Sequence, residues 1–426
     1  MHVSIAPHGE VAGSAVGGPL TTETITTPAT ATTGPTGMTV AIDYDRIRAT
    51  LMVMGIALHA ADVFVSAGDW LVADTHRGAV FDALVALIHS FRVPGFFLLS
   101  GLLFAGSLTR HTAPDLAQRQ LVRLGVPLLT CWILLNTAQA ALLTWHRGGD
   151  PWTALISLST PIAHLWFLRD LLVMNLLALA WVALRRRPAA ASTRGTSTRT
   201  SSMQAPWIRA AVPIHWVSVA LIGALLSHAL LIVVRLSGLA YAPGPGGVTL
   251  FNLAFYAPMF LAGLAMRQGP PWLEAWLRTP PWLLPAAAFM ANWGDAASST
   301  LPGALAREAA LAVELLGIWL ATGAAIGWLA RWRGPSLGGP GRALAEASYT
   351  IFLVHHLMVV VLALLLLPLD WPAALKFPVI AAGALALSLA FHRGVVRPFA
   401  VTRLLFNGRL PEAVHRSRAA AARGRA

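Results

Sequence analysis

The sequence predicts an all-α protein, a polytopic membrane helical bundle of about ten transmembrane helices. Of its 426 residues, 56% are hydrophobic and only 12% are charged, whereas a soluble domain has about 25% charged residues. Apolar runs recur along the chain, and several reach the ~17–25 residues that a helix needs to cross a bilayer. Since lipid offers no hydrogen bonds, each run has to satisfy its backbone groups internally, as a helix does.

Ten apolar segments are expected to form these helices: residues 48–67, 79–105, 121–143, 164–184, 212–236, 249–266, 281–293, 308–331, 347–367 and 374–396. The loops between them are alternately rich and poor in Arg. Cytoplasmic loops carry the excess of positive charge, so an even number of spans with both termini in the cytoplasm is predicted. The formal net charge of +13 would thus face anionic headgroups, and no pattern suggests nucleic-acid binding.

Three stretches outside the spans are expected to lack fixed structure. Residues 1–40 are rich in Thr, Gly, Ala and Pro and contain no Lys or Arg, which predicts a disordered tail rather than a signal peptide. Residues 185–210 have the composition of a flexible cytoplasmic linker, and residues 411–426 that of a basic cytoplasmic tail. The membrane domain then covers residues 41–410. Cys131 is the single cysteine, so no disulfide framework and no metal site are predicted.

An Asp-x-x-Arg sequence opens the first apolar segment, and a histidine lies in its middle. Asp45 and Arg48 are spaced to pair on one helical face. His59 follows Arg48 by eleven residues, so it shares that face after a rise of ~16 Å. Because ionisable groups inside a bilayer are costly and usually functional, His59 is expected to be a catalytic base. The alternative is a buried histidine satisfied by a backbone carbonyl. Asp62, one turn on, could orient the His59 ring or approach the outer interface, and the interface is the favoured position.

The second apolar segment holds His89 and Arg92, three residues apart on one face. A guanidinium at this depth requires a carboxylate, a phosphate or a group of carbonyls. Pro94 follows directly and can loosen the helix beside a cavity. Close helix packing is expected at Ser100-Gly101, since no neighbouring base would activate the serine.

Basic and aromatic residues mark two further helix ends. Arg119 and Arg123 are spaced i, i+4 at the cytoplasmic entrance of a helix, where they could hold the phosphates of a donor or act as a positive-inside anchor. His164 and Trp166 stand at the outer end of the fourth segment. Trp166 suits the interfacial belt and could also stack on a sugar ring.

Two adjacent histidines, His355 and His356, lie in the middle of the ninth segment. Neighbouring helical side chains point about 100° apart, so one ring is expected to face a cavity while the other packs. Ser348 and Tyr349 lie on the same segment, about two turns before them.

These stretches, in this order, resemble the acyltransferase-3 family of membrane acyltransferases. The family's Asp-x-x-Arg with a histidine eleven residues later matches residues 45–59, and its Phe-Phe-x-x-Ser-Gly matches residues 96–101. Its Arg-Leu-x-x-Pro matches residues 123–127. Its late Ser-Tyr-x-x-Tyr-Leu-x-His matches residues 348–355, with Phe352 in place of the second tyrosine.

The resemblance implies transfer of an acyl group from cytoplasmic acyl-CoA to a carbohydrate hydroxyl across the bacterial inner membrane, with no permanently bound cofactor. The motifs are most similar to those of members that succinylate periplasmic glucans. The implied co-substrate is therefore succinyl-CoA, and the implied partners are a periplasmic glucan and the lipid bilayer. Together, residues and resemblance predict the catalytic residues His59, Arg92 and His355. They predict the substrate-binding residues Asp45, Arg48, His89, Arg119, Arg123, His164, Trp166, Ser348, Tyr349 and His356.

Two other interpretations stay open. Within the same chemistry, the acceptor could be another cell-envelope polysaccharide, with an acetyl donor. In a different class, buried His and Arg residues relay protons or bind anions in transporters and flippases, although no inverted repeat is visible here. An acyltransferase leaves an ester on its acceptor, whereas a transporter changes no covalent bond.

Overall fold

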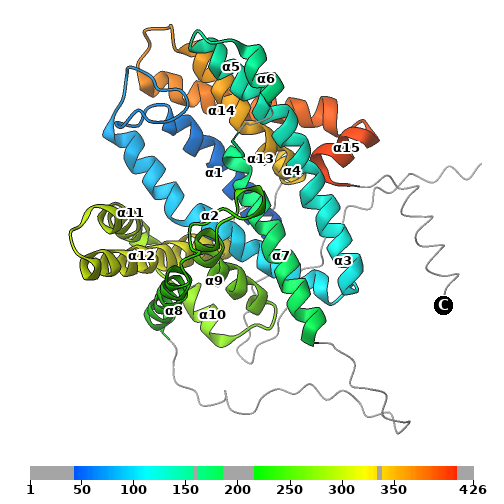
Figure 1. Ribbon diagram of the computed structural model, residues 1–426. Helices are drawn as coiled ribbons and strands as arrows, with labels where there is room; N and C mark the ends of the chain where they lie inside the picture. Colours follow the sequence, from blue (N-terminus) through cyan, green and yellow to red (C-terminus); the bar gives the residue numbers. More distant parts are fainter. Residues whose placement is uncertain (1–42, 158–160, 186–214, 333–337, 410–426) are drawn as a thin grey trace, which may run out of the picture. The chain divides into compact units, whose positions relative to one another are not determined.

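Among the residues that the structure describes, every regular element is a helix, which confirms the predicted all-α fold (Figure 1). The computed structural model describes residues 43–157, 161–185, 215–332 and 338–409. The predicted tail 1–40, nearly all of the linker 185–210 and the tail 411–426 lie outside these residues.

Each of the ten apolar segments overlaps a helix. These helices are α1 (Tyr44–Asp62), α2 (Ala79–Leu108), the run α3 to α5 (Ala113–His146), α7 (Trp166–Arg185), α8 (Trp216–Leu236), α9 (Leu250–Met266), α11 (Leu284–Thr300), α12 (Ala304–Arg331), α13 (Gly339–Leu366) and α14 (Ala373–Phe391). Three short helices accompany them: α6 (Pro151–Ser157), α10 (Pro271–Trp276) and α15 (Ala400–Asn407).

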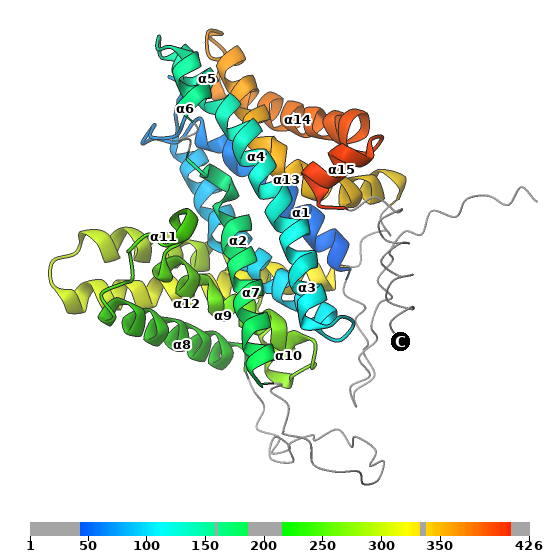
Figure 2. The ribbon, with the colours of Figure 1, turned by 45° about the vertical axis from the view of Figure 1, so that its right-hand side comes forward.

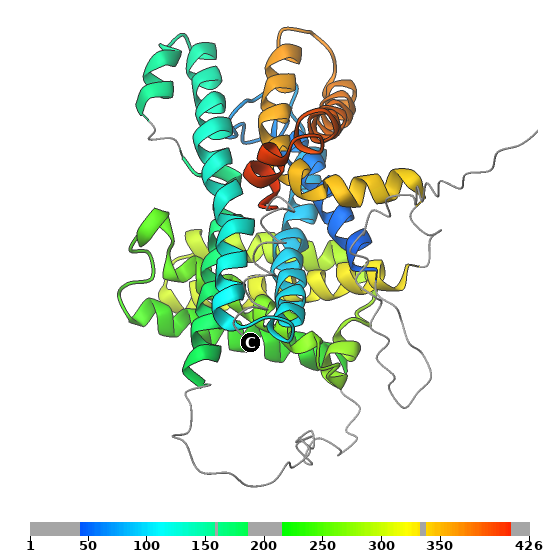
Figure 3. The same cartoon turned by 90° about the vertical axis from the view of Figure 1, so that its right-hand side faces the viewer.

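The run from α3 to α5 is one continuous helical rod with two π-helical turns in it (Figure 3). Its parts are α3 (Ala113–Gln120), η1 (Leu121–Gly125), α4 (Val126–Cys131), η2 (Trp132–Asn136) and α5 (Thr137–His146). Pro127 follows the first π turn and has no N–H for the carbonyl of Arg123, its α-helical partner. Inserted π turns of this kind are frequent at functional sites.

Seven helical segments of the described chain are long and apolar enough to cross a membrane: Ala79–Leu108, Ala113–His146, Ala163–Arg185, Trp216–Leu236, Ala304–Arg331, Gly341–Leu366 and Ala373–Val396. The helix α9 is a shorter apolar one, and α1 carries charged residues in its first turns. Leu225, Leu226 and Val233 of α8 are exposed, as expected of a surface that lipid covers. The protein is therefore a multi-pass membrane protein, and the total of ten spans and the cytoplasmic termini stay predictions.

The helix α1, which carries the first predicted site residues, packs against both α2 and α13. The helix α14 packs against α13 and α1. On another part of the bundle, α12 contacts both α11 and α8 (Figure 2). This arrangement places the motifs of α1, α2 and α13 on neighbouring helices.

Helices α2 and α9 approach each other closely through two glycines. A Cβ atom on Gly101 would collide with the backbone carbonyl of Phe260, and one on Gly263 would collide with that of Leu98. Since the obstacle is backbone in both cases, neither collision could be relieved by moving a side chain. The close packing predicted at Ser100-Gly101 is confirmed.

Candidate active site

Four histidine rings from three parts of the chain meet inside the bundle. His59 comes from α1, His164 from η3 (Ala163–Leu165), and His355 and His356 come from α13. The centroid of the His59 ring lies 5.4 Å from that of His355 and 4.9 Å from that of His356. The His164 ring lies 4.5 Å from His356, stacked, and 5.6 Å from His355. Both adjacent histidines of α13 thus join the cluster, whereas only one was expected to face a cavity.

The ring of His59 is oriented by a carboxylate. Its Nδ1 lies 2.9 Å from Oδ2 of Asp62, one helical turn later. With Asp62 ionised, Nδ1–H donates to the carboxylate, and Nε2 keeps a lone pair that can take a proton. The Asp62 side chain is only 14% exposed. Of the two roles considered for Asp62, orientation of the His59 ring is the one observed, because at i, i+3 its carboxylate reaches the imidazole.

Two of the other rings keep a buried nitrogen without a partner among the described residues. Nδ1–H of His355 donates to the carbonyls of Ile351 (3.0 Å) and Phe352 (2.8 Å), and its Nε2 is buried and unpaired. Nε2–H of His164 donates to the carbonyl of Leu353 (3.3 Å), and its Nδ1 is buried and unpaired. A buried acceptor without a donor costs free energy, so two such atoms in one cluster make it a candidate functional site.

The fourth ring is held by the α3–α5 rod. Nδ1 of His356 lies 2.7 Å from Oε1 of the buried Gln139 on α5, and as an N–H it donates to that oxygen. This leaves Nε2 of His356 as the acceptor nitrogen. Gln139 was not identified from the sequence, because its partner lies 217 positions away in the chain.

The position of His164 depends on a strained backbone. Nδ2 of Asn136, in the second π turn of the rod, donates to the carbonyls of Pro161 (3.0 Å) and Ile162 (2.9 Å). Ala163 follows with φ +45°, a left-handed conformation that costs a non-glycine residue free energy. The anchored segment and this turn bring the next residue, His164, onto the rings of α13.

Arg92 supplies the positive charge beside the cluster. It is 6% exposed, and its Nε–H donates to the carbonyl of Leu51 at 3.1 Å. The guanidinium lies directly on Gly55 of α1, where a Cβ atom would collide with it. Its charge acts on His59, Asp62 and His355. A buried guanidinium in this place can stabilise a developing oxyanion.

Asp45 and Arg48 form the predicted ion pair at the start of α1, with 3.0 Å between Nη2 and Oδ1. Arg48 also donates from Nη2 to the carbonyl of Ala345 on α13 (3.2 Å). The Oγ hydroxyl of Ser348 donates to the same carbonyl (2.7 Å). The start of α1 is thereby joined to α13 at the opposite end of α1 from the histidine cluster.

Tyr349 and Arg123 meet at that same end. The Tyr349 hydroxyl donates to the backbone carbonyl of Arg123 at 3.0 Å, the group that Pro127 leaves without its α-helical donor. The side chains of Arg119 and Arg123 are exposed. The charge of Arg123 acts on Arg48, so basic groups from two helices gather there.

Two predicted site residues have other surroundings. His89 is exposed on α2. Trp166 packs its ring against Tyr256 (5.5 Å between centroids) and Phe167 (6.4 Å). The aromatic ring that contacts the cluster is instead Trp70, from the loop between α1 and α2. It stacks on His59 with 6.1 Å between centroids and 16° between planes, and it meets the edge of His356 at 5.6 Å.

Two site residues, Trp70 and Gln139, were missed in the sequence, and for Asp62 the contact with His59 was the less favoured of two expectations. The i, i+3 spacing of His59 and Asp62 was a usable signal, whereas Trp70 and Gln139 show none in the sequence. Within the described chain, no group of three or more His, Cys, Asp or Glu residues is arranged to hold a metal ion.

The fold and this cluster define a multi-pass membrane protein with a polar, histidine-centred site inside its helices. The family model of the acyltransferase-3 family, described as an acyltransferase domain, matches residues 42–393. The chain therefore belongs to the acyltransferase-3 family and is a membrane acyltransferase.

Similar proteins include the glucans biosynthesis proteins C of Shigella dysenteriae serotype 1 (strain Sd197) and of Escherichia coli (strain K12). Each is 26% identical over 291 residues, which cover 65% of this chain and 71% of the relative. No solved structure significantly matches the chain.

Proposed function

We propose that this acyltransferase moves a succinyl group from succinyl-CoA to a hydroxyl of a periplasmic glucan at the bacterial inner membrane. The observation that carries the proposal is the contact between His59 and Asp62 within the histidine cluster. A carboxylate-oriented imidazole is the usual base for activating a hydroxyl. The glucan acceptor is supported by the chain's similarity to the glucans biosynthesis proteins C.

In the proposed reaction, Nε2 of His59 takes the proton of the acceptor hydroxyl as its oxygen attacks the thioester carbonyl. Asp62 stabilises the imidazolium that forms. The C–S bond then breaks, the new C–O ester bond remains on the sugar, and the imidazolium returns its proton to the departing CoA thiolate. Arg92 either stabilises the oxyanion of the intermediate or pairs with the free carboxylate of the succinyl group.

The unpaired Nε2 of His355 takes one of two alternative roles in this scheme. It accepts a hydrogen bond from the acceptor hydroxyl and so aligns it, or it attacks the thioester itself and forms an acyl-histidine. Rapid acid quenching during turnover, followed by mass spectrometry of the peptide carrying His355, distinguishes the two. An added succinyl mass supports the covalent route.

We assign the CoA end of the donor to the basic groups at the start of α1. Arg48 and Arg123 supply guanidinium groups for phosphates there, and Arg119 on α3 lies one helical turn before Arg123. The exposed Arg119 and Arg123 are accessible to a soluble donor. Acyl-CoA is then a co-substrate that enters from the cytoplasm, and no cofactor stays bound.

The test compares periplasmic glucans from cells that make the native chain, His59→Ala, or the matched control His146→Ala, whose histidine is exposed. Mass spectrometry of the glucans measures added succinyl groups, with membrane levels of the three proteins equalised. Succinylation by the native chain and the control, and none by His59→Ala, is expected. Equal succinylation by all three would remove His59 from the mechanism. If the glucan stayed unmodified and another envelope polysaccharide gained an acetyl group, the donor would be an acetyl donor and the acceptor that polysaccharide.

A further inference from the structure

The loop between α1 and α2, residues 63–78, brings an aromatic ring to the histidine cluster. It follows Asp62 directly, and Trp70 near its middle contacts the rings of both His59 and His356. Trp70 is only partly buried, so a portion of its surface is accessible beside the catalytic base. Asp69, exposed on the same loop, adds a carboxylate that can accept hydrogen bonds from hydroxyl groups.

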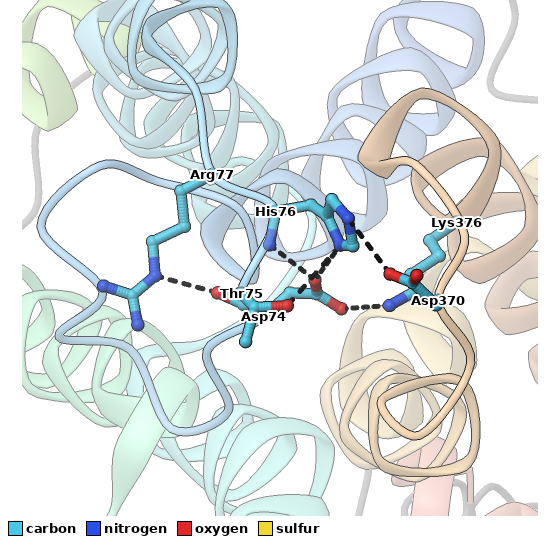
Figure 4. Close-up of polar contacts among 6 residues, drawn as sticks. All are labelled: Asp74, Thr75, His76, Arg77, Asp370 and Lys376. Atoms are coloured by element: carbon cyan, nitrogen blue, oxygen red, sulfur yellow. Dashed lines mark hydrogen bonds and ion pairs between the residues drawn. The ribbon is translucent and has the colours of Figure 1, made fainter.

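The loop is fastened by a buried ion pair (Figure 4). Oδ2 of Asp74 lies 2.6 Å from Nζ of Lys376 at the start of α14, and their side chains are 2% and 1% exposed. The backbone N–H of His76 donates to Oδ1 of Asp74 (2.8 Å). The Nε–H of Arg77 donates to the backbone carbonyl of Asp74 (2.8 Å). Lys376 is the only lysine of the chain, and the structure commits it to holding this loop.

A second fastening ties the loop to the first turn of α2. The backbone N–H of Ser66 donates to Oδ1 of Asp82 (2.8 Å), and its hydroxyl donates to Oδ2 (2.5 Å). Trp70 thus lies between two anchored points, four residues from each. A ring held in this way loses little conformational freedom when a ligand binds against it.

We propose that Trp70 forms the acceptor subsite, on which a pyranose ring of the carbohydrate stacks so that one of its hydroxyls meets Nε2 of His59. This inference rests on the proposed function and adds the residue that positions the sugar. The face of an indole is a large apolar surface, which matches the apolar C–H face of a sugar ring. Among the described residues, the ring contacts of Trp166, the aromatic expected to stack on sugar, are with Tyr256 and Phe167 rather than with the histidine cluster.

The test uses the full-length chain purified into lipid nanodiscs. The variants are Trp70→Ala, Trp70→Phe and the matched control Trp282→Ala, whose side chain is exposed on another part of the fold. Calorimetry measures binding of a short unmodified glucose oligosaccharide without acyl-CoA. A second assay measures kcat, KM for the oligosaccharide, KM for succinyl-CoA and the hydrolysis of succinyl-CoA without acceptor.

Trp70→Ala is expected to weaken oligosaccharide binding and raise the KM for the oligosaccharide about tenfold, which one stacking contact can account for. The KM for succinyl-CoA should stay unchanged, and Trp70→Phe should restore most of the affinity because it keeps an aromatic face. Unchanged binding and unchanged acceptor KM in Trp70→Ala would overturn the inference. Faster hydrolysis of succinyl-CoA with an unchanged acceptor KM would also overturn it, by making Trp70 a barrier to water.

The two assays, oligosaccharide binding and acyl transfer, distinguish failure of this inference from failure of the proposed function on which it rests. Binding that depends on Trp70, without acyl transfer to any acceptor, would support the subsite and contradict the proposed reaction. Acyl transfer with an acceptor KM that does not depend on Trp70 would support the reaction and contradict the subsite. A native chain that neither binds nor modifies the oligosaccharide would overturn both.

Discussion

The contact between His59 and Asp62 arises within one helix and determines the protonation of the His59 ring. One turn of α1 separates the two residues, so the helix itself sets their contact without help from another element. The carboxylate selects which ring nitrogen carries the proton and favours the imidazolium during transfer. The role of Asp62 is thus to make His59 a better base, and His59 depends on it even when every other contact is intact.

We expect Asp62→Asn to lower kcat by about 10²-fold or more, the usual contribution of an effective general base, with little change in KM for either substrate. The amide keeps the size of the side chain but removes the charge that stabilises the imidazolium. Initial rates of ester formation by purified chain in nanodiscs measure this. The control is Glu274→Gln, a carboxylate-to-amide change at an exposed residue of α10. A native-like kcat in Asp62→Asn would show that the contact has no part in catalysis.

At this scale, the sequence singled out the four histidines and Arg92, but few of the contacts between residues distant in the chain. His59, Arg92 and His355 stood out because ionisable groups inside apolar segments are costly, and His164 stood out at the outer end of its segment. Trp70 had no such signal, since a tryptophan in a loop is ordinary, and its role depends on where the loop folds back. The sugar-stacking role was accordingly given to Trp166, whose local sequence was equally suitable.

Among the elements, the loop 63–78 is joined by a buried ion pair to a helix that is distant in the sequence. Asp74 and Lys376 are 302 positions apart in the sequence, so their ion pair joins the loop after α1 to the first turn of α14. A buried pair contributes little net free energy relative to an apolar replacement, but removal of one partner leaves the other charge buried and unpaired.

Lys376→Met is therefore expected to lower the free energy of unfolding by about 3–5 kcal/mol. The double variant Asp74→Asn, Lys376→Met should recover part of this, because the asparagine carries no charge and can still accept from the N–H of His76. Thermal denaturation in detergent gives the comparison, with Arg342→Met as a control at an exposed cation of α13. If the double variant were less stable than Lys376→Met, the unpaired carboxylate would not be the cause of the loss.

Acid should weaken the same fastening. Burial alone would raise the pKa of Asp74, but hydrogen bonds from Lys376 and His76 and the charge of Lys376 outweigh it and hold the pKa below its ordinary value. A carboxyl with a lowered pKa in the folded state stabilises the protein above its unfolded pKa of ~3.9, and that contribution is lost as the pH falls through the folded pKa.

The difference in Tm between the native chain and Asp74→Asn is accordingly expected to shrink as the pH falls below about 4. Taking the difference removes the effects of the other carboxylates that titrate in this range. A difference that grew on acidification would contradict the direction of the pKa shift.

For the molecule as a whole, the sequence predicted the helices well and their neighbours not at all. Each apolar segment is a helix because length and hydropathy act locally. The short helices α6, α10 and α15 were missed, since helices of six to eight residues lack a readable apolar period. That α1 packs between α2 and α13 follows from tertiary contacts that no spacing encodes.

The orientation in the membrane gives the last prediction. Cys131 is the single cysteine of the chain, so Cys131→Ala gives a cysteine-free background. Single cysteines are then introduced at two exposed positions, Thr75 and Asp115. Because the segment from Arg110 to Arg123, which includes α3, is Arg-rich, this end of the helices is expected in the cytoplasm. An impermeant maleimide should label Thr75→Cys in intact spheroplasts and Asp115→Cys only after lysis. The reverse pattern would place loop 63–78 in the cytoplasm and remove it from any periplasmic acceptor.

The left-handed backbone at Ala163 bears on how this enzyme could be engineered. A glycine would occupy that conformation without strain, so selection for heat resistance alone should favour Ala163→Gly. The same replacement would let the residues before His164 sample other conformations and loosen the imidazole from its place on α13. The replacement would then raise thermostability and lower turnover. A library of variants at position 163, measured for Tm and for kcat, would show how much rigidity this turn requires.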